Sequence, residues 1–231
     1  LAGYKGAIFV MNPDTGAILA MTSRPSYDPY TIDNLWDEIT SDPSDSRLVN
    51  RATQGRYIPG SIFKIVTTLE YMKENKNYND FHFNCTGRAD FKGFHINCFD
   101  QTAHYSEDLT HAFAYSCNSA FSTIGEGLNM KKFKKTAKQL LFNSPLPLDM
   151  DYNESVFALN SKSSQFEITQ TSIGQGETTV SPAHMAMIAS AIANNGILMK
   201  PYIIKYVENS QGKILKSNEE TEYKELMTKK Q

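Results

Sequence analysis

A serine and a lysine near residue 60 have the types and the spacing needed for nucleophilic catalysis. Ser61 follows the helix-breaking pair Pro59-Gly60, and Lys64 comes three residues later. Apolar residues then recur at helical spacing, so Ser61 is predicted to open a helix that carries Lys64 on the same side. The unpaired N–H groups at a helix N-terminus favour an anionic oxygen, and Lys64 is the adjacent base that a serine nucleophile needs.

This assignment depends on the protonation of Lys64. A lysine with its usual pKa is protonated, so burial or a cationic neighbour must keep Lys64 neutral before it can accept a proton. Spacing alone fits a second interpretation, in which Ser61 only caps a helix and Lys64 points into water.

A second hydroxyl and a carboxamide lie two residues apart, at Ser116 and Asn118. In a continuous helix, side chains at that spacing point in different directions, so both can face one site only if the chain leaves the helix there. Held together in a tight turn, they could pass a proton and anchor an amide substrate. Alone, the pair also fits an ordinary turn that interrupts a helix.

Sulfur and imidazole side chains gather in the middle of the chain. Three cysteines, Cys85, Cys98 and Cys117, contain no Cys-x-x-Cys pair and leave the redox compartment undecided. Cys85, His95, Cys98 and His104 fall within twenty residues, which permits a zinc site made of sulfur and imidazole. Their spacings match no standard zinc finger, and free or buried thiols are the alternative.

The composition is that of an ordinary globular protein. The 231 residues are 40% hydrophobic and 11% aromatic, and a net charge of −2 argues against a general nucleic-acid binder. The chain has no apolar run of about eighteen residues, so it is expected to be soluble. Residues 1–5 lack the pattern of a signal peptide, and because the chain begins with Leu1 rather than Met, we expect it to be cut from a longer protein.

Hydrophobic periodicity and turn signals predict the elements that position these residues. The predicted elements are a hairpin of 6–12 and 17–22, the Ser61 helix to about residue 73, short strands within 78–105, a helix start at 106–108, a helical pattern over 121–128, an amphipathic helix over 130–142 with a solvated lysine face, a flexible loop at 173–177, a helix from 181–182 to about 194, and strands at 202–207 and 213–215. The charged remainder is predicted to be mobile.

Taken together, these stretches resemble the penicillin-binding proteins, the serine D,D-transpeptidases of peptidoglycan synthesis, which share a fold with serine β-lactamases. Residues 6–21 are similar to the family's opening hairpin, and residues 24–29 to the segment after it. Residues 59–64 are similar to the nucleophile motif, and Ser116-Cys117-Asn118 to the second motif. Gly174-Gln175-Gly176 with Ser181-Pro182 is similar to a later landmark. The likeness is greatest to class B, the monofunctional type.

The resemblance implies an α/β (α+β) fold, with an antiparallel sheet flanked by helices and a mainly helical subdomain. It predicts one incomplete domain over 1–231, with a hairpin and connection at 1–60, a mainly helical region at 61–200, and a strand, turn and charged tail at 201–231. The family's third motif, Lys-Thr-Gly, has no counterpart, and residues 228–231 do not supply it. We therefore expect the C-terminal strands to be missing and the chain by itself to be weakly active or inactive.

The resemblance also implies a role for each candidate residue. Ser61 would be the acylated nucleophile, Lys64 the base that takes its proton, and Ser116 the relay to the leaving D-alanine. Asn118 would position Lys64 and the substrate amide. The implied ligands are D-Ala-D-Ala stem peptides and β-lactam antibiotics, with no cofactor required and no nucleic acid. The implied whole protein is tethered to the bacterial cell membrane, faces away from the cytoplasm, and works with a membrane glycan polymerase in cell-wall synthesis and cell shape.

Two alternatives stay open. A β-lactam hydrolase or sensor of the same fold would need a carboxylate that activates water, for which Glu154, Glu167 and Glu177 are available. A non-catalytic scaffold would keep the fold only for interaction with cell-wall partners. The sequence does not distinguish elongation, division and sporulation as the cellular role.

Overall fold

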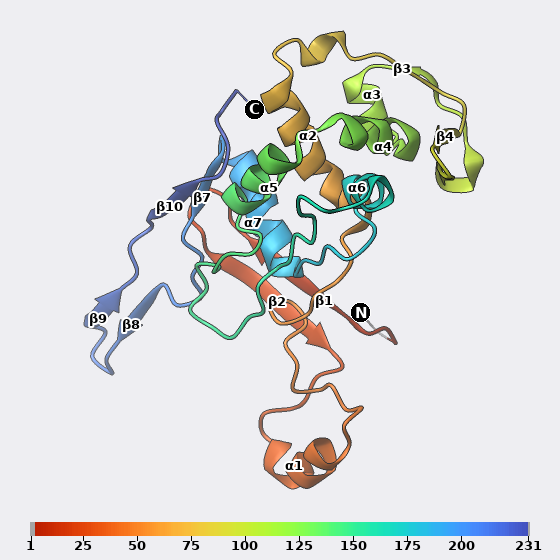
Figure 1. Ribbon diagram of the computed structural model, residues 1–231. Coiled ribbons are helices and arrows are strands. Elements are labelled where there is room, and N and C mark those ends of the chain that lie inside the picture. The colour runs from red at the N-terminus through yellow and green to blue at the C-terminus, as the bar shows by residue number, and fades with distance from the viewer. Residues whose placement is uncertain (1–2, 231) are drawn as a thin grey trace. The chain divides into compact units, whose positions relative to one another are not determined.

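The computed structural model describes residues 3–230, which form two compact units (Figure 1). One unit comprises residues 3–57, 144–155 and 180–230, and the other comprises Ile58–Asn143 and Val156–Thr179. The two sets of candidate residues, around Ser61 and around Ser116, belong to the second unit. Leu1, Ala2 and Gln231, which the predicted domain boundaries include, lie outside the described residues, and the assignment of 1–231 to one domain stays a prediction.

The first unit is built around an antiparallel hairpin that confirms the predicted one. Its turn closes where the Asn12 N–H donates to the Ala17 carbonyl oxygen at 2.8 Å, and helix α7 packs against β1 and β7. Ser181 caps α7 by accepting from the His184 N–H at 3.2 Å, as the Ser-Pro signal predicts. The elements of this unit are β1 (Gly6–Met11), β2 (Ile18–Arg24), α1 (Ile32–Ser41), α7 (Pro182–Ala193), β7 (Ile197–Met199), β8 (Tyr206–Glu208), β9 (Ile214–Ser217) and β10 (Glu222–Glu225).

The end of the chain is more ordered than the sequence predicts. The strand expected at 202–207 begins only at Tyr206, because the backbone of Tyr202 instead pairs beside β2, where its carbonyl accepts from the Ile18 N–H at 2.8 Å. β10 pairs antiparallel with β7, and the following Leu226 and Met227 are buried. The prediction of a mobile remainder was therefore wrong for this strand, because its partner is distant in sequence.

The second unit contains most of the helices, and its elements are η1 (Gly60–Phe63), α2 (Lys64–Glu74), η2 (Tyr78–Asp80), β3 (Phe83–Cys85), β4 (Arg88–Phe91), β5 (Phe94–Asn97), η3 (Phe99–Gln101), β6 (Tyr105–Glu107), α3 (Leu109–Ala114), α4 (Asn118–Gly127), α5 (Met130–Gln139) and α6 (Gln165–Ser172). Helix α2 packs against α4 and α5, and α4 packs against α6. Phe63 is fully buried, with its ring centroid 5.7 Å from that of Phe142 and 6.2 Å from that of Phe157. This aromatic core holds the turn that carries Ser61.

Helices α3 and α4, on either side of Ser116, each begin at a different residue from the one that the sequence predicts. The helix expected to start at 106–108 begins at Leu109, because Ser106 and Glu107 belong to β6, which pairs with β3. Asp108 is the cap and accepts from the His111 N–H at 2.7 Å. The next helix, α4, is capped by Cys117, whose sulfur accepts from the Ala120 N–H at 3.3 Å.

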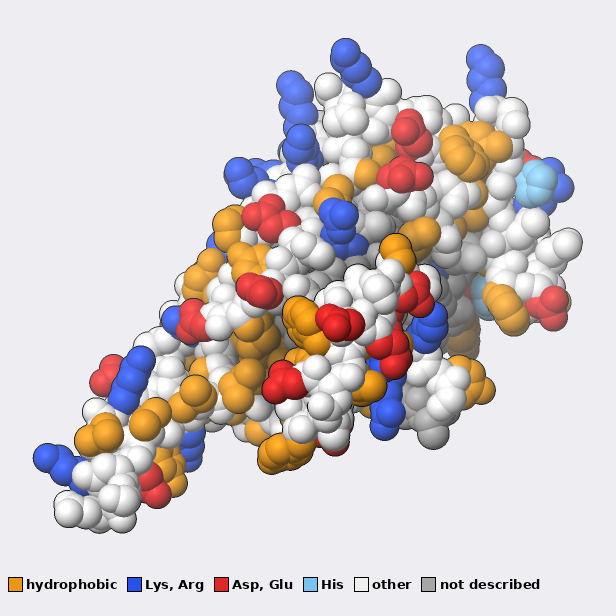
Figure 2. Space-filling model, turned by 90° about the horizontal axis from the view of Figure 1, so that it is seen from below, with side chains coloured by type: hydrophobic (Ala, Val, Ile, Leu, Met, Phe, Trp, Pro, Cys, Tyr) orange, Lys and Arg blue, Asp and Glu red, His pale blue; other side chains and the backbone are white. Residues whose placement is uncertain are grey.

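Charged side chains cover the exposed face of helix α5. The lysines of α5 are exposed while Phe133 and Ala137 are buried, so the predicted solvated face of this helix is confirmed. On the face drawn in Figure 2, acidic, basic and hydrophobic side chains are interspersed rather than gathered by sign. Between residues 3 and 230, none of the helices combines the length and the apolar content needed to cross a bilayer.

Candidate active site

Ser61 lies in the short 3-10 turn η1, immediately before α2. The sequence predicts that Ser61 opens the helix, but the α-helix itself begins three residues later, at Lys64. The capping positions of η1 and α2 are occupied by Pro59 and Phe63, and neither helix start has a side-chain capping hydrogen bond. Ser61 is exposed. Its hydroxyl is therefore available for chemistry instead of satisfying the helix end.

Two glycines fix the backbone just before Ser61. The Gly60 N–H donates to the Gly174 carbonyl oxygen at 2.8 Å, and both residues have positive φ, +61° and +79°. A Cβ at position 174 would overlap the Gly60 carbonyl oxygen. Gly174, in the loop that follows α6, is thus required by close backbone approach and not by loop flexibility alone.

Lys64 occupies the centre of the site. Its side chain is 1% exposed, and its Nζ lies 3.1 Å from Ser61 Oγ and 2.8 Å from Ser116 Oγ. The same nitrogen lies 2.8 Å from Asn118 Oδ1 and 3.1 Å from the Ser116 carbonyl oxygen. The structure therefore brings together all four residues that the sequence analysis selected, with Ser61, Ser116 and Asn118 within hydrogen-bonding distance of the Lys64 amine.

Burial lowers the pKa of Lys64 from 10.5 to about 8, although negative charge on the sulfurs of Cys117 and Cys98 acts in the opposite direction. The Phe121 ring contributes to this burial, and its centroid lies 5.7 Å from Nζ. With a pKa near 8, about one molecule in ten carries a neutral Lys64 at pH 7, against about one in three thousand for an unperturbed lysine. The environment thus raises the fraction of neutral amine, the form that the chemistry needs, by about three-hundredfold.

The second motif sits in a turn between α3 and α4. Ser116 has a φ of +54°, outside the helical region, and Asn118 is the first residue of α4. Because the chain leaves the helix at Ser116, both side chains reach Lys64, as the sequence analysis requires. Asn118 is oriented by a second hydrogen bond, in which its Nδ2 donates to the Asn97 carbonyl oxygen at 3.1 Å.

The arrangement forms a short proton path that begins at an exposed hydroxyl. A neutral Lys64 amine can accept the proton of Ser61, and Ser116 Oγ is close enough to the same nitrogen to receive and pass on a proton. The oxygen of Asn118 holds the amine in place. This is the geometry of a serine nucleophile activated by a lysine.

Three contributors to this site were missed by reasoning from the sequence. They are the Gly60–Gly174 hydrogen bond, the Asn97 carbonyl that orients Asn118, and the Phe121 ring beside Lys64. The Gly-x-Gly pattern at 174–176 was the available signal for the first. The other two are contacts between distant segments that no local pattern marks.

A group of sulfur and imidazole side chains also forms in this unit. Cys85, Cys98 and His104 come together, but the fourth member is Cys117 and not His95. On β5 successive side chains alternate, so the buried Ile96 faces inward and the exposed His95 faces outward.

Comparison with known proteins places the chain in a family. Residues 6–231 match the model of the penicillin binding protein transpeptidase domain. The chain is 30% identical over 222 residues to peptidoglycan D,D-transpeptidase PbpA of Mycolicibacterium smegmatis, which covers 87% of this chain and 43% of the relative. It is 32% identical over 198 residues to stage V sporulation protein D of Bacillus subtilis. This match covers 84% of this chain and 29% of the relative. The chain thus spans less than half the length of these relatives.

Solved structures share the fold. The D,D-transpeptidase domain of a peptidoglycan glycosyltransferase from Eggerthella lenta matches with a TM-score of 0.90 and 30% identity, over 100% of this chain and 59% of that one. The imipenem acyl-enzyme complex of penicillin-binding protein A from M. tuberculosis matches with a TM-score of 0.86 and 25% identity, over 98% and 54%. The predicted α/β (α+β) fold is therefore confirmed. The chain belongs to the penicillin-binding protein transpeptidase domain family.

Proposed function

We propose that the whole protein is a peptidoglycan D,D-transpeptidase that works through an acyl-enzyme on Ser61. The observation that carries this proposal is the buried Lys64 amine, which lies within 3.1 Å of Ser61 Oγ, Ser116 Oγ and Asn118 Oδ1. Family membership supports the same reaction class. The chemistry uses protein groups alone and needs no cofactor.

In this mechanism, Ser61 Oγ attacks the carbonyl carbon of the penultimate D-alanine of a stem peptide while Lys64 Nζ takes its proton. N–H groups at the start of η1 and α2 stabilise the oxyanion. Ser116 relays a proton to the nitrogen of the terminal D-alanine, and the C–N bond breaks. An acceptor amine of a second stem peptide then attacks the ester, and Ser61 regains its proton.

The same nucleophile would open β-lactam rings. Penicillin-binding protein A of M. tuberculosis forms acyl-enzyme complexes with imipenem, ceftriaxone and penicillin G. A β-lactam presents a strained amide to the site in place of the D-Ala-D-Ala amide, and Ser61 would form the corresponding ester. Because the ester persists when water is not activated, the antibiotic would inhibit the enzyme.

The 231-residue chain by itself is proposed to react slowly. It contains no Lys-Thr-Gly tripeptide, and losing one oxyanion-hole donor typically costs about a hundred- to a thousandfold in rate. The whole protein is proposed to be tethered to the cell membrane, to face away from the cytoplasm, and to act with a membrane glycan polymerase. These features rest on the family resemblance.

The hydrolase alternative has less support in this structure. Glu167 is one of the three carboxylates that it could use, but this side chain closes a capping box at the start of α6. Its Oε2 accepts from the Ser164 N–H at 2.7 Å and from the Ser164 hydroxyl at 2.8 Å. Glu167 is therefore occupied in holding a helix end.

Release of D-alanine tests the proposal. The whole protein, given a stem-peptide donor and an amine acceptor, should release one D-alanine per cross-link, and Ser61→Ala should abolish the release. With penicillin, the wild-type protein should keep a long-lived acyl group, because a transpeptidase does not activate water. Rapid multiple turnover of penicillin would instead establish the hydrolase, and unchanged cell-wall function of Ser61→Ala in cells would establish the scaffold.

A further inference from the structure

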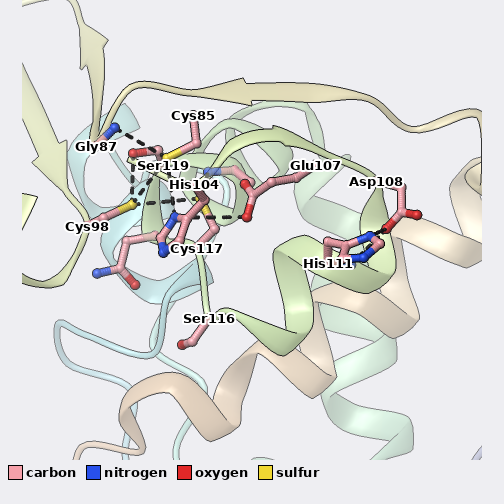
Figure 3. A network of polar contacts seen from close by, with 12 residues as sticks. Cys85, Gly87, Cys98, His104, Glu107, Asp108, His111, Ser116, Cys117 and Ser119 are labelled. Carbon is pink, nitrogen blue, oxygen red and sulfur yellow. Dashed lines mark hydrogen bonds and ion pairs between the residues drawn. The ribbon is translucent and has the colours of Figure 1, made fainter. Parts of the chain in front are cut away.

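Four side chains with metal-binding atoms converge beside the second motif (Figure 3). Cys85 ends β3, Cys98 follows β5, His104 precedes β6, and Cys117 caps α4. Their ligand atoms all lie within 4.8 Å of one another. Three of the four residues come from separate places in the β3–β6 segment, so the chain folds around a common point rather than along one motif.

Three of the distances between these atoms are close to the edges of a tetrahedral zinc site. The Cys85 and Cys98 sulfurs are 3.7 Å apart, as are those of Cys98 and Cys117, and the Cys85 sulfur is 3.4 Å from His104 Nδ1. With Zn–S near 2.3 Å and Zn–N near 2.05 Å, a tetrahedron has S···S edges of about 3.8 Å and S···N edges of about 3.6 Å. These three edges thus fit one central ion, and the remaining atom pairs lie within 4.8 Å of one another.

The surroundings favour thiolates. All three cysteines are buried and none is in a disulfide. The Gly87 N–H donates to the Cys85 sulfur at 3.3 Å, and the Ala120 N–H donates to the Cys117 sulfur at 3.3 Å. Backbone donors of this kind stabilise negative sulfur and orient it toward a metal.

A buried carboxyl group next to the cluster provides an independent indication. Glu107 is 1% exposed, and neither of its carboxyl oxygens has a hydrogen-bond partner within residues 3–230. Its Oε1 lies 3.9 Å from His104 Nδ1, the contact marked in Figure 3. A buried carboxylate that accepts no hydrogen bond is costly, and a divalent cation held by the neighbouring side chains would offset that cost.

We propose that Cys85, Cys98, His104 and Cys117 bind one Zn²⁺ in a closed, structural Cys₃His site, with Glu107 beside it. Binding converts three thiols to thiolates and releases up to three protons per zinc ion. No open coordination position remains, so the ion holds the fold rather than catalysing a reaction.

The site would fix the second motif. Cys117 lies between Ser116 and Asn118, and Figure 3 shows its side chain directed into the sulfur cluster while Ser116 points away from it. Ser116 and Asn118 are the two residues of this motif that contact Lys64. The zinc ion therefore ties the β3–β6 segment to the start of α4 and holds both side chains on the amine. The binding does not rest on the proposed function, but this effect on acylation does.

Metal analysis of the whole protein, purified under reducing conditions, tests the binding. We expect one zinc per chain, a cobalt-substituted form with intense thiolate-to-metal absorption, and proton release on adding zinc to the metal-free form. Cys85→Ser and His104→Ala should lose the metal, and Glu107→Gln should weaken binding by about ten- to a hundredfold. His95→Ala is the matched control on β5 and should keep it.

Three results would overturn the proposal. These are iron instead of zinc in the wild-type protein, no uptake of zinc at micromolar concentrations after reduction, and equal zinc binding by His104→Ala and His95→Ala. Measurement on the wild-type protein keeps the test valid even if a cysteine variant fails to fold. A circular dichroism spectrum of each variant separates lost ligands from lost structure.

The effect on the active site needs a separate measurement. Removing zinc with a chelator should slow penicillin acylation of Ser61 at least tenfold, and returning zinc should restore the rate. If metal-free and zinc-bound protein react equally fast, the positioning role is wrong although the metal site stands. If the zinc-bound protein is not acylated at all, the proposed function fails and the metal site again stands.

Discussion

The pH dependence of acylation tests whether Lys64 is the base. Burial lowers the pKa of Lys64 to about 8, and only the unprotonated amine can take the Ser61 proton. The neutral fraction is then about 1% at pH 6 and about 50% at pH 8. The rate constant for acylation should therefore rise about fiftyfold from pH 6 to pH 8 and level off above pH 9.

The direction of this pH dependence follows from the charge of the Lys64 amine. Acid protonates the amine and removes the base, so activity is lost as pH falls through the pKa, not gained. Had Lys64 kept its ordinary pKa of 10.5, the rate would still climb about tenfold per pH unit between pH 8 and pH 10. The position of the inflection thus reports burial of the amine directly.

The assay is stopped-flow acylation of the whole protein by a chromogenic cephalosporin between pH 5.5 and 9.5, with circular dichroism at each pH. Lys64→Arg should lower the rate by about a hundred- to ten-thousandfold at every pH, because a guanidinium cannot accept a proton. Lys135→Arg, an exposed lysine of α5, should leave the profile unchanged. A flat profile between pH 6 and pH 8, or an active Lys64→Arg, would refute Lys64 as the base.

Three further substitutions probe the parts that hold the site. Gly174→Ala should lower acylation by about a hundredfold, because its Cβ would overlap the Gly60 carbonyl oxygen and displace Ser61; a wild-type rate would show that this contact is dispensable. Asn118→Ala should slow acylation by about ten- to a hundredfold by freeing the lysine amine, measured with the same cephalosporin, and no change would contradict its positioning role. Phe63→Ala should destabilise the protein by about 3–5 kcal/mol in urea unfolding, because the ring is fully buried among other aromatic rings; a loss below about 1 kcal/mol would contradict that packing.

Local signals in the sequence predicted local structure well. The hairpin of β1 and β2 follows from two apolar runs around a turn, and α7 follows from the Ser-Pro cap. Helix α6 was not predicted because its apolar and polar residues have little helical periodicity. Its start was nonetheless visible as the Ser164–Glu167 capping box.

Local sequence patterns could not predict the contacts between distant segments of the chain. Ser61 and Lys64 could be paired from spacing, but Ser116 lies 52 residues from Lys64, and only the family resemblance connected them. The four proposed zinc ligands illustrate the same limit. Strand alternation excludes His95 from the cluster, and the turn at Ser116 brings Cys117 into it. Neither placement can be read from the separation of residues in the chain.

Mass spectrometry of the penicillin adduct tests the identity of the nucleophile most directly. The whole protein, treated with penicillin and digested, should carry one β-lactam on the peptide that contains Ser61, and Ser61→Ala should carry none. Ser164→Ala, which alters a serine used only for capping, should be labelled like the wild type. An adduct on another residue, or a full adduct on Ser61→Ala, would contradict the proposal that Ser61 is the nucleophile.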